Sequence, residues 1–120
     1  MTWYAAHIIV SYRTKSAKRI LIHELVHLVS GETDDQAHAK ATSIGQGYDA
    51  QDPSARLNGK PVVSKLEGIR KLRSIQNDPP TGDDITPTDG CEVTYSVMEI
   101  EERNLKKLVS GEPTAIRYED

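Results

Sequence analysis

The chain has 120 residues, of which 37% are hydrophobic and 28% charged, and its formal net charge is −3. That length suits one domain spanning 1–120, and the acidic balance excludes non-specific nucleic-acid binding through a basic surplus. No apolar stretch approaches the twenty or so residues that cross a bilayer, so we expect no membrane partner. The single cysteine, Cys91, cannot form an intramolecular disulfide, and the Met1-Thr2-Trp3 start lacks signal-peptide character, so we expect a cytoplasmic protein.

The first predicted element is a strand from Trp3 to Arg13. His7 and Ser11 occupy one parity, and the other parity is apolar or aromatic: Tyr4, Ala6, Ile8, Val10 and Tyr12. Period-two alternation of β-branched and aromatic side chains is typical of a strand with one buried face.

The stretch His23-Glu24-Leu25-Val26-His27 matches a zinc-hydrolase pattern. On a helix, the two histidines share one face and can chelate zinc, with Glu24 as general base. On a strand they lie roughly 13 Å apart and cannot share one ion. The β-branched residues and the short polar turn before the stretch favour a strand over Ile20–Val29, central in the sheet. We predict no catalytic, cofactor or metal site, and a zinc-dependent hydrolase using His23, His27 and Glu24 is the alternative.

A helix is predicted from Thr33 to Gly45. Thr33 and Gln36 form a capping box, and small or apolar residues then recur at helical spacing: Ala37, Ala41, Ile44 and Tyr48. This thin stripe predicts a helix packed close across one face of a sheet.

The later segments carry weaker signals. Residues 61–75 fit either a helix or a strand, and 76–90 predict an acidic surface loop rich in Pro, Gly and Asp. Cys91–Ile100 predicts a strand, Glu101–Ser110 a short helix, and 114–118 an edge strand.

Two other groups of side chains could carry a function. His7 could lie beside His23 or His27, and separate histidines are the favoured interpretation. Eight of the fifteen basic residues fall in two clusters, which could bind a small anion or an acidic partner, although a solvated surface is favoured. The clusters are Arg13, Lys15, Lys18 and Arg19, and Lys65, Arg70, Lys71 and Arg73.

The chain resembles a family of small bacterial proteins catalogued as a domain of unknown function. The resemblance rests on Trp3-Tyr4-Ala5, on the passage from Val26-His27-Leu28-Val29 through Thr33, Gln36-Ala37 and Lys40-Ala41, and on Asp89-Gly90-Cys91-Glu92-Val93-Thr94-Tyr95-Ser96. It spans nearly the whole chain except the loops. It implies an α+β fold, with a strand leading into a helix, and it supplies no activity.

We therefore predict an α+β domain with elements in the order β-β-α-β-β-α, an antiparallel sheet and the main helix on one sheet face. The favoured function is a non-enzymatic module acting through protein contacts, of an adaptor, regulator or toxin-neutralising type. A homo-oligomer, dimer first, would cover the second sheet face. The alternatives are the zinc hydrolase and a binder of a small anionic ligand.

Overall fold

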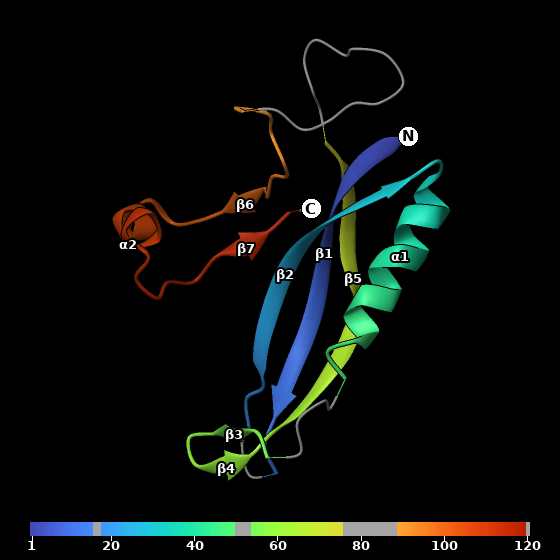
Figure 1. The fold of residues 1–120 in the computed structure, drawn as a ribbon. Coiled ribbons are helices and arrows are strands. Elements are labelled where there is room, and N and C mark those ends of the chain that lie inside the picture. The colour runs from blue at the N-terminus through green and yellow to red at the C-terminus, as the bar shows by residue number, and fades with distance from the viewer. Residues whose placement is uncertain (16–17, 50–53, 76–88, 120) are drawn as a thin grey trace.

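Three long antiparallel strands in the order β2-β1-β5 form the main sheet of the computed structural model, which describes residues 1–15, 18–49, 54–75 and 89–119. Strand β1 spans Thr2–Arg13, β2 spans Leu21–Gly31 and β5 spans Val63–Ser74. Helix α1, Asp34–Gln46, lies along one face of this sheet (Figure 1). The predicted α+β fold is confirmed. We call the side of the sheet covered by α1 the helix face, and the opposite side, which carries His7, the polar face.

Strand β1 is the centre of the sheet. Ile8 and Val10 are fully buried on the helix face, and Ser11 is fully buried on the polar face. The prediction of one buried face for this strand was wrong, because β1 is covered on both sides.

Strand β2 is an edge strand, so the prediction that Ile20–Val29 is central was also wrong. Among the described residues β2 pairs with β1 alone, from Thr2↔Gly31 to Tyr12↔Leu21. The hairpin places β2 on one side of β1, and β5 then pairs with the other side after α1 has crossed the sheet. As a result, several large aliphatic side chains of β2 are 43–51% exposed: Leu21, Ile22, Val26 and Leu28.

Helix α1 begins as its capping box predicts. Thr33 Oγ1 accepts from the N–H of Gln36 at 3.1 Å, and Gln36 Oε1 accepts from the N–H of Glu32 at 2.9 Å. The helix buries Ala37, Ala41 and Gly45 against the sheet. A Cβ atom on Gly45 would lie 2.6 Å from Leu66 Cδ1, so any larger residue here would force the Leu66 side chain to shift.

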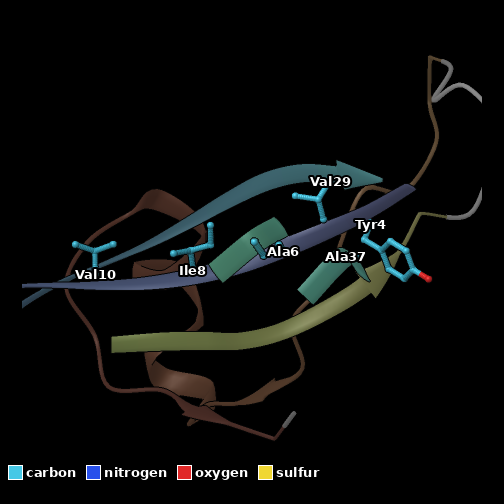
Figure 2. Close-up of a cluster of buried hydrophobic side chains, with 7 residues drawn as sticks. Tyr4, Ala6, Ile8, Val10, Val29 and Ala37 are labelled. Atoms are coloured by element: carbon cyan, nitrogen blue, oxygen red, sulfur yellow. The ribbon is translucent and has the colours of Figure 1, made fainter. Parts of the chain in front are cut away.

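The hydrophobic core fills the space between α1 and the helix face. Figure 2 shows side chains of β1 gathered with Val29 and Ala37 in one cluster: Tyr4, Ala6, Ile8 and Val10. Tyr4 also donates its hydroxyl to Asp34 Oδ1 at 2.7 Å, which joins the core to the first turn of α1. That hydrogen bond, with burial, raises the pKa of Tyr4.

Strand β5 resolves the ambiguity of residues 61–75, and it contains two bulges. His7 pairs with Lys71 and Ile8 pairs with Ile69, so Arg70 is an inserted residue. Ile9 pairs with Gly68 and Val10 pairs with Leu66, so Glu67 is a second inserted residue. Each insertion lets a charged side chain reach the polar face without displacing the apolar side chains that pack on the core.

The remaining elements are short. Asn58-Gly59, both with positive φ, turn a two-stranded hairpin of β3, Arg56–Leu57, and β4, Lys60–Pro61. A second hairpin pairs β6, Met98–Glu99, with β7, Arg117–Tyr118. Between them lie a 3-10 turn, Glu102–Asn104, and helix α2, Leu105–Ser110.

The C-terminal predictions were correct for the helix, and wrong for most of Cys91–Ile100 and most of 114–118, where only Arg117–Tyr118 is a strand. Within Cys91–Ile100 only β6 has a ladder, apart from an isolated bridge at Glu92. The predicted loop 76–90 lies outside the described residues except for its last two positions. None of the described helices is long and apolar enough to span a bilayer.

Candidate functional site

The His-Glu-Leu-Val-His stretch lies on β2 as extended chain, as predicted. Its histidines point to the helix face, where His27 Nε2 lies 2.9 Å from the hydroxyl of Tyr48. The His23 ring packs against the Tyr12 ring, with centroids 4.6 Å apart and an interplanar angle of 52°. Glu24 lies on the opposite, polar face. Because the stretch is a strand and not a helix, the two histidines cannot chelate one zinc ion within a single chain, which is the geometry that the zinc alternative requires. Among the described residues, no group of three or more His, Cys, Asp or Glu is placed to hold a metal ion.

His7 does not join the other two histidines, because it points to the polar face. It forms a cluster with Glu24, Arg70 and Thr94, which we call the His7 cluster. His7 Nδ1 lies 2.6 Å from Glu24 Oε2, and its Nε2 contacts Thr94 Oγ1. Arg70 Nη1 donates to the other oxygen of Glu24 at 3.3 Å.

The order carboxylate, imidazole, hydroxyl is the order used in nucleophilic catalysis. A carboxylate only accepts hydrogen bonds, so Nδ1 carries a proton and a neutral ring accepts from the hydroxyl of Thr94. His7 is only 3% exposed, and its carboxylate partner is also held by Arg70. We assign the cluster a structural role, because it anchors the segment around Thr94 to the strands of the sheet.

The basic residues of β5 fasten the same segment. Lys71 Nζ donates to the carbonyl of Tyr95, and Arg73 Nη1 donates to the Tyr95 hydroxyl at 2.6 Å. The guanidinium of Arg73 lies 4.1 Å from the Tyr95 ring centre, and that of Arg70 lies 4.0 Å from the Tyr118 ring centre. These side chains therefore bind the chain's own C-terminal segment, whereas the sequence alone predicts them only as part of an anion or partner surface.

The first-turn basic cluster has a different environment. Arg13 Nη1 donates to Glu67 Oε2 at 2.6 Å, whereas Lys15, Lys18 and Arg19 are exposed. The first-turn cluster therefore contains one cation, Arg13, that is already paired with a carboxylate of β5.

Comparison with known proteins places the chain in a family. Residues 3–96 match the model described as a domain of unknown function (DUF4288). The chain belongs to this family. No curated protein and no solved structure matches it. The matched stretch of the DUF4288 domain contains the main sheet except for Thr2, together with α1 and the His7 cluster, whereas β6, α2 and β7 follow it.

The second charged group of the DUF4288 domain on the polar face is centred on Glu67. Its carboxylate accepts from Ser11 Oγ at 2.5 Å as well as from Arg13. The hydrogen bond from Ser11, followed by the one from Arg13, lowers the pKa of Glu67. Because the folded-state pKa lies below the unfolded one, these contacts stabilise the fold above the ordinary pKa of glutamate. That contribution is lost as the pH falls through the lowered value.

Replacing Ser11 by alanine is expected to raise the pKa of Glu67 toward the ordinary value of about 4.3, because the largest lowering interaction is removed. NMR titration of the side-chain carboxyl carbon measures this shift directly. Ser74→Ala, at the other end of β5, is the control and should leave Glu67 unchanged. An unchanged Glu67 pKa in Ser11→Ala would contradict the hydrogen bond.

The backbone of β2 turns a row of hydrogen-bonding groups away from β1. Ile75 donates its N–H to the carbonyl of Trp3 at 2.9 Å, so the odd-numbered residues of β1 face β5 and the even-numbered residues face β2. Since Tyr4 pairs with Val29, the odd-numbered residues of β2 face β1. The N–H and C=O groups of the even-numbered residues therefore point outward: Ile22, Glu24, Val26, Leu28 and Ser30.

The two edges of the sheet differ in protection. On β5, the outward N–H of Leu66 donates to Asp49 Oδ1 at 2.6 Å, and two bulges and Lys65 interrupt the edge. On β2, the pairing register runs without a shift and the strand contains no proline or lysine. Among the described residues, Lys40 Nζ donates to the outward carbonyl of Ser30 at 2.6 Å and also contacts its hydroxyl. Natural proteins usually protect edge strands by such devices, so the open edge of β2 is the candidate functional site. Sequence reasoning missed it because it placed this strand in the interior.

Proposed function

We propose that this DUF4288 domain is a non-enzymatic, cytoplasmic protein-binding module, which accepts an extended strand along the outer edge of β2. The single observation that carries the proposal is that open edge, 11 residues long and without a neighbouring strand among the described residues. An adaptor, a regulator or a toxin-neutralising protein can bind its partner through such an edge. The cytoplasmic location rests on the single cysteine.

Strand addition requires backbone groups for affinity and side-chain contacts for specificity. The outward groups of β2 supply the former. The exposed side chains of Ile22, Val26 and Leu28 supply apolar contacts on the polar face. At the far end of the strand, a cavity of about 390 Å³ between β2 and α1 is lined by Trp3, Leu28 and Ile44, among others, and can receive a partner's side chain.

The charge distribution of β2 also suits a neutral, apolar strand. Glu24 is the only Asp, Glu, Lys or Arg residue of β2, and its carboxylate is paired with the Arg70 guanidinium and contacts His7. A docking strand therefore meets no uncompensated charge that would lose its water on binding.

The test compares two substitutions at Val26 in affinity capture. Proline removes an N–H that points away from β1, so Val26→Pro blocks strand addition and leaves the β1–β2 ladder intact. Val26→Thr keeps the N–H and is the matched control. A partner retained by the wild type and by Val26→Thr should bind Val26→Pro at least about tenfold more weakly when reconstituted from purified proteins.

Thermal unfolding of Val26→Pro checks that the variant is folded. If the captured proteins bind wild type, Val26→Thr and a folded Val26→Pro with equal affinity, the edge of β2 is not the docking site.

A further inference from the structure

We infer that the strand accepted by β2 is β2 of a second copy of this chain, paired antiparallel around a twofold axis at Leu25. The inference rests on the proposed function, since it requires β2 to be a docking edge, and it names the partner. Twofold pairing of an edge strand with itself is self-complementary and closes at two copies.

The outward backbone groups restrict the register. Only even-numbered residues can form hydrogen-bonded pairs, and the Ser30 carbonyl is taken by Lys40. An axis at Val26 would pair Ile22 with Ser30 of the second copy, and an axis at His27 would pair Glu24 with that same Ser30. Both registers must displace the Lys40 contact.

An axis at Glu24 places two carboxylates directly opposite each other, which is unfavourable. An axis at Leu25 avoids both conflicts and leaves Ser30 outside the paired stretch. It sets Leu25 against its own equivalent, and Glu24 faces Val26 of the second copy while keeping its bonds to His7 and Arg70.

Apolar side chains also match in the Leu25 register. Ile22 faces Leu28 of the second copy, and Leu21 faces Val29 of the second copy, each pair occurring twice about the axis. Ile22, Leu28 and Leu21 are the exposed aliphatic residues of β2 that this pairing covers. The same register sets His23 opposite His27 of the second copy, so the two histidines of the motif meet between chains.

Pairing would produce one continuous sheet of six long strands, in the order β5-β1-β2-β2-β1-β5. Its outer edges would both be β5, where bulges, Lys65 and Asp49 oppose further addition. Both β2 edges are then paired with each other, so the assembly stops at a dimer.

The first experiment measures the mass in solution by sedimentation. We expect the wild type and Val26→Thr to be dimers and Val26→Pro to be a monomer. A wild type that stays monomeric up to about 0.1 mM overturns the second copy as partner. The capture experiment then decides the proposed function separately, because a different protein bound through the same edge would uphold it.

The second experiment tests the register by cross-linking in a Cys91→Ser background. Hydrogen-bonded antiparallel pairs have Cα atoms about 5.5 Å apart, which suits a disulfide. Ile22→Cys combined with Leu28→Cys should therefore give a covalent dimer on mild oxidation. Within one chain these positions lie roughly 20 Å apart on the same strand and cannot join.

Ile22→Cys combined with Val26→Cys is the matched control, since those positions face each other only around an axis at Glu24. The expected result is an efficient cross-link for the first pair and little for the second. The reverse result, or a dimer that neither pair cross-links, overturns the Leu25 register.

Discussion

Replacing Ile8 by alanine is expected to lower the free energy of unfolding by about 3–4 kcal/mol. Ile8 is fully buried in the centre of β1, between α1 and the two neighbouring strands, so the truncation leaves a cavity that the sheet cannot close. For a domain of this size, the loss corresponds to a fall in Tm of roughly 12 °C. Urea unfolding and calorimetry measure both quantities.

Ile22→Ala is the matched control, because it makes the same change on β2, where the side chain is 43% exposed. Both variants are measured in the Val26→Pro background, so that pairing between copies does not contribute. We expect Ile22→Ala to cost less than about 1 kcal/mol. Equal losses of unfolding free energy for the two variants would contradict the order β2-β1-β5 and would indicate that β2 is an interior strand.

Replacing His7 by leucine is expected to cost about 3 kcal/mol and to release the segment around Thr94 and Tyr95 from the polar face. Leucine has a similar volume but bonds to neither Glu24 nor Thr94, which leaves a partly buried carboxylate without its closest partner. Limited proteolysis should then cut within 89–119 much faster than in the wild type, at a urea concentration where the sheet is still folded.

The control for this variant is His38→Leu, which makes the same change at an exposed position of α1. It should change stability by less than about 0.5 kcal/mol and leave the rate of proteolysis unaltered. If His7→Leu behaves in the same way as His38→Leu, the His7 cluster does not fasten the C-terminal segment.

Local signals predicted the hairpin of β1 and β2 and the start of α1. The capping box at Thr33 and Gln36 depends on atoms within one turn, so the residues themselves determine the geometry. The alternation around Ile8 likewise depends only on the period of an extended chain. These parts of the fold are encoded over short distances along the chain.

The bulges explain why 61–75 resembled both a helix and a strand. Leu66, Ile69 and Leu72 all pack against the core although they are three positions apart. Each inserted residue, Glu67 and Arg70, lengthens the strand period by one, which produces a spacing close to that of a helix. Only the pairing with β1 reveals the insertions.

The open edge of β2 could not be recognised from the sequence, because strand pairing between distant segments determines it. The sequence shows that β2 is apolar on both parities, but the same pattern suits an interior strand and an edge strand that pairs with another chain. The order of strands depends on where β5 returns after α1. The His7 cluster joins residues 87 positions apart, His7 and Thr94, and no local pattern signals such a contact.

The two insertions in β5 have a consequence for how this strand can change over time. Each inserted residue shifts the positions beyond it by one relative to β1, so that Leu66, Ile69 and Leu72 all reach the core at a spacing of three residues. Deleting Glu67 or Arg70 would remove one bulge and leave the other residues of β5 paired with β1 as before, because the remaining residues would then alternate regularly. Each insertion can therefore be gained or lost on its own, and its loss removes one charged side chain from the polar face without disturbing the core.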